Sequence, residues 1–390
     1  MWVQFSGKSQ RRYNRRGISP YTGGRSRPSP RDRARDAGQR GELFQRYLDE
    51  VKAYVQCADE LGYAGYGHNE HHLQIEGFEE TNHPGMTSLF IGLHSKRLKA
   101  NTIGYVMPTH NPVRVAEEIA TLDHILKGRL SVGFTRGYQA RWFQTYAAVP
   151  GARATTPDLA KRRDQQDQIN REIFEESVKI IKTAWTNDVF SYEGKYWTFP
   201  PKDLVQPHSA YLKFGKGSTP DGHIEKIGIA PRPYQKPHPK IYGAFAHSMR
   251  TVRFWAREGG KPIVLANNLD FCRDLWDGYR QEAEKAGRNV PEEDIAAWGG
   301  ILSIDKSRER ALQKLEQHWW VWDNWFLPFD QARPMAIVGT PDEVSRQIET
   351  AYDRLRFNEI HLQIGQGYLE KGEVLDELEL FASKVMPRFG

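Results

Sequence analysis

The sequence predicts an α/β fold, namely a (β/α)8 TIM barrel, from three observations. The chain has 390 residues, which is enough for one large barrel. About eight strand-like segments alternate with helix-like segments, and such alternation is typical of a parallel sheet. No G-x-G-x-x-G motif follows an early strand, which disfavours the open sheet of a dinucleotide-binding fold.

The elements follow from hydrophobic patterns with the periods of strands and helices. Strands are expected over residues 1–5, 64–68, 98–107, 130–135, 240–244, 262–265, 296–304 and 360–364. Helices are expected over residues 44–61, 112–126, 166–186, 248–258, 270–286, from 306 onward, 341–354 and 374–385. Residues 188–238 are rich in Gly, Pro and His, so we expect an insertion there, with a hairpin around 190–199. The chain is thus predicted to be a single barrel domain over residues 1–390.

A basic segment lies near the N-terminus, in the loop expected over residues 10–41. Residues 11–40 hold ten arginines and two aspartates, a local charge of +8, so the rest of a chain with net charge +6 carries −2. The Arg, Gly, Pro and Ser content predicts a poorly ordered loop. A polyanion such as nucleic acid is one possible partner, but a solvated or substrate-facing loop is the simpler interpretation, because no aromatic-interleaved basic fold accompanies the charge. If this loop follows the first strand of a barrel, it emerges at the catalytic mouth and steers anionic ligands.

The cysteine content and the lack of long apolar stretches indicate the cellular compartment of the protein. Cys57 and Cys272 both lie in helix-like segments, which favours two buried thiols over a disulfide. No apolar stretch has the length of a membrane span or of a signal-peptide core. We therefore expect a cytoplasmic protein without a membrane partner.

The candidate site residues stand where the expected strands end, because barrel enzymes carry their active sites there. The second strand is followed by Glu70-His71-His72. A metal site is disfavoured, since adjacent histidines on an extended chain point to opposite sides. One histidine acting as an acid or base is favoured, and a hydrogen-bonded histidine at the rim is the alternative.

Three further positions suit a flat, anionic ligand. Gly104, in the third strand, allows the backbone to approach closely. Arg136 ends the fourth strand and suits an anion, although a structural ion pair would explain it equally well. Ser248 and Thr251 begin a helix and could bind a phosphate or merely cap the helix.

These segments resemble the bacterial-luciferase-like flavin-dependent monooxygenases. The matching residues are 70–72 (EHH), 108–117 (PTHNPVRVAE), 122–123 (LD), 127–129 (KGR), Gly133, 136–137 (RG), 338–344 (VGTPDEV), 380–381 (LF) and 385–387 (VMP). The resemblance extends from about residue 44 to residue 389. It implies a barrel that is usually dimeric and binds reduced FMN, which a separate flavin reductase commonly supplies. It also implies that O2 adds at C4a of the flavin and that the resulting C4a-peroxyflavin oxygenates a substrate.

The resemblance also implies roles for individual residues. His71 matches the catalytic histidine, and Thr135 stands where the luciferases have a cysteine, which favours a non-luminescent oxygenase. Glu70 and Gly104 match positions whose backbone contacts the isoalloxazine, and the bond before Gly104 matches a cis non-prolyl peptide. The phosphate-binding positions are matched by Arg136, Arg171, Ser248 and Thr251.

Residues 318–329 (HWWVWDNWFLPF) contain four tryptophans in seven positions, too many for one helix face. They could form an apolar wall that keeps the site dry, or a dimer contact. Together these features predict a two-component FMN-dependent monooxygenase with a small organic substrate, and no metal. One alternative is a deazaflavin-dependent dehydrogenase on the same barrel. Another is a flavin- or polyanion-binding protein without turnover.

Overall fold

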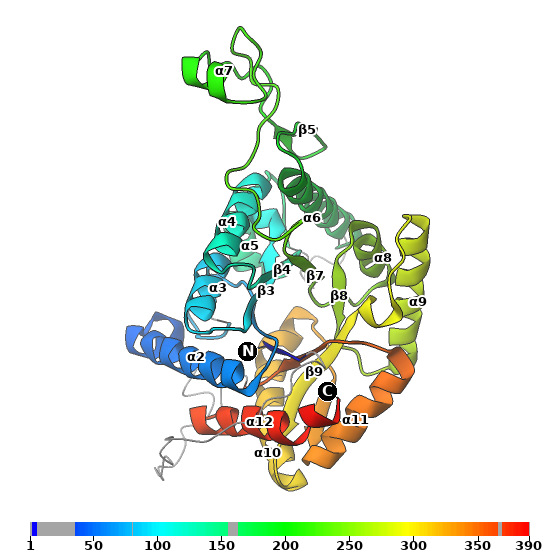
Figure 1. The fold of residues 1–390 in the computed structure, drawn as a ribbon. Helices are drawn as coiled ribbons and strands as arrows, with labels where there is room; N and C mark the ends of the chain where they lie inside the picture. Colours follow the sequence, from blue (N-terminus) through cyan, green and yellow to red (C-terminus); the bar gives the residue numbers. More distant parts are fainter. Residues whose placement is uncertain (1, 6–35, 80, 155–162, 366–368, 390) are drawn as a thin grey trace. The chain divides into compact units, whose positions relative to one another are not determined.

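The computed structural model describes residues 2–5, 36–79, 81–154, 163–365 and 369–389. The chain divides into two compact units. The first comprises residues 1–104 and 241–390, and the second comprises residues 105–240. Figure 1 labels helices and strands of both units.

The first unit contains a sheet of mostly parallel strands. The strands are β1 (Trp2–Phe5), β2 (Gly65–His68), β3 (Lys99–Val106), β7 (Lys240–Gly243), β8 (Lys261–Val264), β9 (Ala297–Ile304), β10 (Ala336–Gly339) and β11 (Ile360–Gln363). Two of them cross the division between the units, because β3 belongs to the first unit only as far as Gly104 and β7 only from Ile241 onward. The pairs β2–β3, β7–β8, β8–β9, β9–β10 and β9–β11 are all parallel. The strands are buried almost throughout, as expected for parallel strands that helices cover.

Strand β1 departs from the predicted pattern because it runs antiparallel to both of its neighbours. Val3 lies opposite Tyr66 of β2 and Leu362 of β11, and Phe5 lies opposite Ile360, where β11 begins. The chain therefore leaves β1 at the amino ends of β2 and β11. This corrects the expectation that the basic segment emerges where the site residues lie, although its described end returns there, since the Gly38 N–H donates to the Ile75 oxygen in the loop after β2 at 3.2 Å. The segment itself lies largely outside the described residues.

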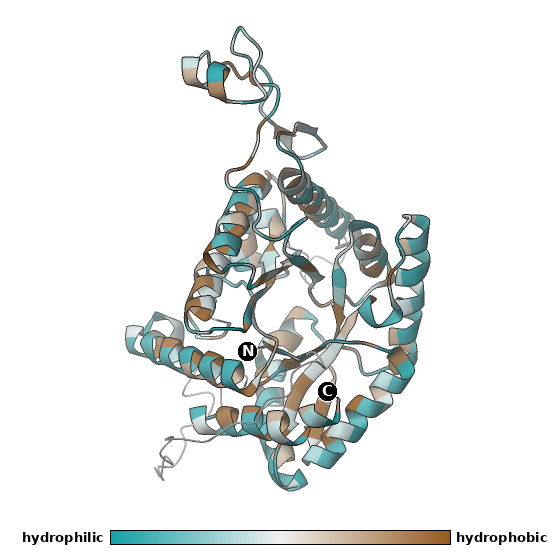
Figure 2. Cartoon of the chain, in the orientation of Figure 1, coloured by the Kyte–Doolittle hydropathy of each residue, from teal (hydrophilic) through white to brown (hydrophobic). Residues whose placement is uncertain are grey.

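The helices of the first unit are α2 (Gly41–Leu61), α3 (Pro84–Leu93), α8 (Met249–Glu258), α9 (Leu269–Lys285), α10 (Arg308–Val321), α11 (Pro341–Leu355) and α12 (Lys371–Lys384). Helices α2, α8, α9 and α11 are amphipathic, whereas α3 is largely apolar and leaves Met86 and Leu93 exposed. Figure 2 shows hydrophilic residues along much of α9 and α11. Their buried sides carry residues such as Trp276 and Ile348, which contribute to the core. Cys57 of α2 and Cys272 of α9 are buried free thiols, as predicted.

The second unit contains β4 (Leu130–Thr135) and the helices α4 (Pro112–Ile125), α5 (Ala140–Tyr146) and α6 (Arg163–Thr186). The indole Nε1 of Trp185 in α6 donates to the backbone oxygen of Ala116 in α4 at 3.0 Å and fixes the two helices together. The expected hairpin is present as β5 (Tyr192–Glu193) and β6 (Thr198–Phe199), which pair antiparallel. Beyond it lies the exposed helix α7 (Ser209–Phe214), far from α6 in Figure 1.

Candidate functional site

The segment after β2 holds the predicted catalytic histidine in a fixed loop. Its backbone is tied across the loop, because the His71 N–H donates to the Thr81 oxygen at 2.9 Å. The Thr81 hydroxyl in turn donates to the Asn69 oxygen at 2.8 Å. The side chain of His71 is buried, and that of His72 is half-buried. The loop thus holds Glu70, His71 and His72 in one short segment after β2.

Each of the two histidines binds a different carboxylate. Nε2 of His71 lies 3.0 Å from Oε1 of Glu79, and Nε2 of His72 lies 2.8 Å from Oε1 of Glu70. The two rings therefore face different partners, as the alternation of an extended chain requires. Among the described residues, no group of three or more His, Cys, Asp or Glu side chains is arranged to hold a metal ion.

His71 is held in its neutral form. Burial lowers the pKa of His71 below its ordinary value, and this effect outweighs the carboxylates of Glu79 and Glu70, which raise it. An ionised carboxylate only accepts hydrogen bonds, so the ring proton of neutral His71 lies on Nε2 and Nδ1 is the basic nitrogen. His71 is thus prepared to accept a proton at Nδ1.

Glu79 links His71 to the tryptophan-rich segment, a connection that sequence reasoning missed. Helix α10 continues into a π-helix (Trp322–Phe326). From it, Nε1 of Trp325 donates to Oε2 of Glu79 at 2.8 Å. The Trp325 ring also stacks on Phe78, with ring centroids 4.8 Å apart. Trp320, Trp322 and Trp325 pack with Phe78 against the buried Val321 and Phe326. The choice between an apolar wall and a dimer contact stays a prediction.

Gly104 lies in β3, and the peptide bond before it, Ile103–Gly104, is cis, as the resemblance implied. The neighbouring side chain of Ile103 is buried in a cluster with Tyr242, Ile263 and Ala297. Gly104 is itself buried, and its lack of a side chain permits another group to approach its backbone closely.

In the second unit, the two predicted phosphate-binding arginines share one carboxylate. Nη1 of Arg136 lies 2.5 Å from Oδ1 of Asp167, and Nη2 of Arg171 lies 3.8 Å from Oδ2 of the same residue. Arg136 follows Thr135, the last residue of β4, and precedes Gly137. Gly137 has φ of +73°, and a Cβ there would lie 2.6 Å from Val106. The donors suit a phosphate, but Asp167 offsets part of their charge.

Asp167 was not predicted as a site residue. The signal was present, because Asp167 and Arg171 are four residues apart on a predicted helix and so share one face. In the first unit, Ser248 is the N-cap of α8, and its hydroxyl accepts from the Thr251 N–H at 3.3 Å. The two hydroxyl oxygens are 3.0 Å apart, so Ser248 and Thr251 are brought together as predicted.

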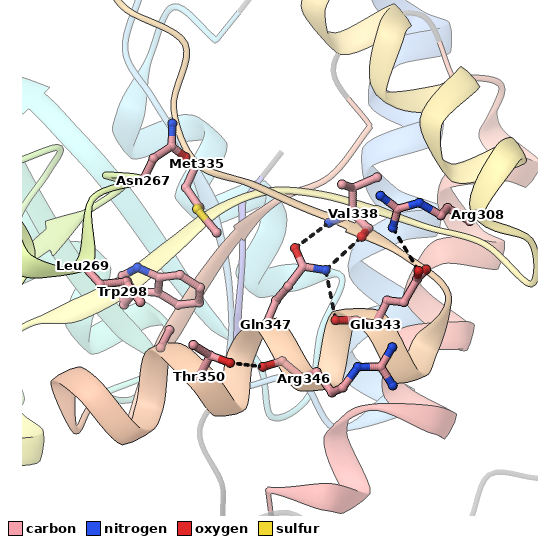
Figure 3. A pocket seen from close by; sticks show the side chains of 11 residues that line it. Asn267, Leu269, Trp298, Arg308, Met335, Val338, Glu343, Arg346, Gln347 and Thr350 are labelled. Carbon is pink, nitrogen blue, oxygen red and sulfur yellow. Dashed lines mark hydrogen bonds and ion pairs between the residues drawn. The ribbon is translucent and has the colours of Figure 1, made fainter.

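A cavity of about 440 Å³ in the first unit is lined by none of the predicted site residues (Figure 3). Its polar groups join α11 to β10. Gln347 accepts from the Val338 N–H at 3.3 Å and donates to the Val338 oxygen at 2.8 Å. Arg308 pairs with Glu343 at 2.9 Å. These contacts hold α11 against β10 and α10.

Comparisons with known proteins place these features in context. A family model described as luciferase-like monooxygenase matches residues 29–359. The chain is 26% identical over 373 residues to the oxygenase component of a flavin-dependent trigonelline monooxygenase from Acinetobacter baylyi, covering 88% of this chain and 91% of that protein. It is 20% identical over 365 residues to 3,6-diketocamphane 1,6-monooxygenase from Pseudomonas putida, with coverages of 87% and 92%.

Two solved structures share the fold. The oxygenating constituent of 3,6-diketocamphane monooxygenase from Pseudomonas putida, in complex with FMN, matches with a TM-score of 0.68 and 20% identity, covering 88% of this chain and 94% of that one. An F420-dependent secondary alcohol dehydrogenase, in complex with an F420–acetone adduct, matches with a TM-score of 0.62 and 13% identity, with coverages of 88% and 95%. The predicted α/β barrel is therefore confirmed. Within the described ranges, no helix is long and apolar enough to cross a bilayer.

Proposed function

Because this chain belongs to the luciferase-like monooxygenase family, we propose that it is a two-component FMN-dependent monooxygenase acting on a small organic substrate. The observation that carries the proposal is the buried His71–Glu79 pair, which stands in the Glu70-His71-His72 motif after β2. Reduced FMN would supply the two electrons with which O2 is cleaved, one oxygen entering the substrate and the other leaving as water.

His71 is the proposed catalytic acid or base. Its neutral ring accepts a proton at Nδ1 and returns it later, while Glu79 balances the charge of the protonated ring. The surrounding apolar cluster limits the access of water. Thr135 contributes a hydroxyl where luciferases have a cysteine, which supports an oxygenase that does not emit light.

The proposed flavin contacts fall into two classes. Glu70 and Gly104 offer backbone to the isoalloxazine. Phosphate binding is assigned to Arg136, Arg171, Ser248 and Thr251. The guanidinium groups match the bidentate geometry of phosphate oxygens, and the start of α8 offers N–H groups and two hydroxyls. These assignments rest on the sequence motif and on the donor chemistry of each group.

The second candidate is a deazaflavin-dependent dehydrogenase, which the fold similarity to the F420-dependent alcohol dehydrogenase favours. Such an enzyme transfers a hydride to or from its substrate and has no use for O2. The same His71–Glu79 pair could move the accompanying proton. The two candidates therefore differ in cofactor and in oxygen consumption rather than in the histidine pair.

The proposal includes partners and location. A separate flavin reductase delivers reduced FMN, as the name of the trigonelline monooxygenase oxygenase component suggests for that relative. We also propose a cytoplasmic homodimer, with a mass of about 90 kDa from two chains of 45.0 kDa. Sedimentation equilibrium tests the dimer, and a mass of one chain would refute it.

An oxygen-uptake experiment tests the function. Purified protein is mixed anaerobically with reduced FMN or reduced F420, and aerated buffer and candidate substrates are then added. We expect tight binding of reduced FMN and O2 consumption that matches product formation. Selective binding of F420, with substrate turnover under nitrogen, would establish the dehydrogenase instead.

A further inference from the structure

One carboxylate joins two segments of the first unit that are far apart in the sequence. Glu79 lies in the loop after β2, and Trp325 lies in the π-helix after α10, 246 residues away. Oε1 of Glu79 faces Nε2 of His71 at 3.0 Å, and Oε2 faces Nε1 of Trp325 at 2.8 Å. Each carboxylate oxygen thus has its own N–H partner, which fixes both the position and the rotation of the group.

The setting of Glu79 requires support from elsewhere in the fold. The Glu79 side chain is only 11% exposed, although an isolated carboxylate is costly to bury. Its backbone has φ of +55°, a left-handed conformation that non-glycine residues seldom adopt. Strain of this kind persists where neighbouring contacts hold it, and it clusters at functional sites. The Trp325 hydrogen bond and the stacking of Trp325 on Phe78 are such contacts.

We propose that Glu79 is a positioning residue for His71, and that the indole of Trp325 holds Glu79 in place for this task. The inference rests on the proposed catalytic role of His71. Glu79 keeps the ring proton on Nε2 and so presents Nδ1 as the proton acceptor. Trp325 makes the tryptophan-rich segment part of the histidine's support rather than only an apolar wall.

The charged and titratable groups that act on His71 are Glu79, Glu70 and His72. Glu79 and Glu70 raise the pKa of His71, whereas burial and His72 lower it. Loss of the Glu79 charge must therefore lower this pKa further. Glu70 already binds His72 at 2.8 Å, so it is engaged elsewhere and cannot simply replace Glu79.

The chain offers a matched control for Trp325. Trp322 lies in the same π-helix and stacks on Phe326, with ring centroids 4.3 Å apart. Its Nε1 donates to the Gln331 oxygen at 2.9 Å. A Trp→Phe change at either position removes one indole hydrogen bond and keeps an aromatic ring, but only the change at 325 affects Glu79.

The first measurement needs no turnover. Nitrogen NMR of the full-length protein with isotope-labelled histidines follows the chemical shifts of the two His71 ring nitrogens as a function of pH. The signals that disappear in His71→Gln are those of His71. Wild type should show the proton on Nε2. In Glu79→Gln the His71 pKa should fall and both tautomers should be populated, because an amide can donate or accept. Trp325→Phe should move the His71 signals in the same direction by less, and Trp322→Phe should leave them unchanged.

The second measurement is the pH dependence of kcat and KM with reduced FMN and substrate. We expect kcat to fall about 10–100-fold in Glu79→Gln, with KM unchanged, and the acidic limb of the profile to move to lower pH. Trp325→Phe should reduce kcat about tenfold, the effect of one hydrogen bond to a charged group. Trp322→Phe does not touch Glu79, so the acidic limb of its profile should stay where wild type has it.

The two measurements separate this inference from the proposed function. Identical His71 titration and tautomer in wild type and Glu79→Gln would overturn the positioning role. Equal effects of the two Trp→Phe changes would overturn the role of Trp325. If the NMR shifts occur as expected but His71→Ala turns over substrate like wild type, the pairing stands and the proposed catalytic role of His71 fails.

Discussion

At the scale of single residues, Arg136 and Arg171 reveal how the proposed phosphate contacts are balanced. Both face Asp167, so the three side chains carry a net charge of +1 rather than +2. We expect Arg136→Ala to weaken the binding of reduced FMN by about 1.5–3 kcal/mol, the scale of a hydrogen bond to a charged group. Riboflavin, which lacks the phosphate, should be nearly indifferent. Fluorescence titrations measure both, and equal losses would refute the phosphate role.

Asp167→Asn should change the affinity for FMN in the opposite direction and strengthen binding. Removing this carboxylate leaves both guanidinium groups with more positive charge to offer, so FMN should bind about 3–10-fold more tightly. The gain is kept small because Arg136 and Asp167 are each about one-third exposed, and solvent screens their interaction. Riboflavin binding should again stay constant. Weaker FMN binding would show instead that Asp167 serves mainly to orient the arginines.

Loss of the His71 side chain should affect the chemical step rather than flavin binding. His71→Ala should leave flavin binding largely intact and slow product formation about 10²–10⁴-fold, the range for a lost acid or base group. A larger share of the O2 consumed should appear as hydrogen peroxide. Rapid-quench product analysis with a peroxide assay measures both quantities. Normal coupling of O2 to product would make His71 a rim residue, the alternative that its sequence position leaves open.

At the scale of elements, Asp59 joins the last turn of α2 to the turn before β3. Its carboxylate accepts from the N–H groups of Lys96, Arg97 and Leu98 at 3.0, 2.8 and 2.7 Å. Burial acts to raise the pKa of Asp59, but these hydrogen bonds outweigh it and the pKa is lowered. Asp59→Asn should therefore cost about 1.5–3 kcal/mol of unfolding free energy at pH 7.

The sign of the pH dependence follows from the lowered pKa. The stabilisation is complete above the ordinary value of 3.8 and is lost as the pH falls through the lower, folded-state value. Wild type and variant should thus converge below about pH 3.8 in urea unfolding. The exposed neighbour Glu60 provides a control, since Glu60→Gln should change stability by less than about 0.5 kcal/mol. A constant difference at all pH values would contradict the mechanism.

The sequence located most elements because their patterns are local. The helix predicted over 166–186 is α6 (Arg163–Thr186), and the strand predicted over 130–135 is β4. Helix α3 escaped prediction because Pro84, Gly85 and Gly92 give it low helical propensity. Strand β10 (Ala336–Gly339) was not predicted either. The Glu79–Trp325 contact could not be predicted, since no local pattern encodes a pair 246 residues apart.

At the scale of the whole chain, the direction of β1 was the main error. A four-residue strand followed by a link of about thirty residues can enter a sheet in either direction, because such a link imposes no handedness. The family motifs, in contrast, are long and specific, so family and fold were correctly predicted. Thr135, Arg136 and Ser248 lie at element ends, as expected, but their flavin contacts stay predictions.

Ligand binding should stabilise the folded protein as a whole. FMN present at about 100 times its dissociation constant adds about 2.7 kcal/mol, because it binds the native chain and not the unfolded one. We therefore expect thermal unfolding to shift upward with FMN, less with riboflavin and not with F420. Scanning calorimetry measures these shifts, and Arg136→Ala should reduce the difference between FMN and riboflavin. A larger shift with F420 would favour the dehydrogenase.

Trp325 also equips the protein with an internal optical reporter. Indole emission is sensitive to nearby charge, and this ring donates its N–H to Glu79 while lying against Phe78. The chain has eleven tryptophans, so the difference in fluorescence between wild type and Trp325→Phe isolates the contribution of this one. That difference spectrum would follow proton movement beside His71 in real time, in the absence of any turnover and without an added dye.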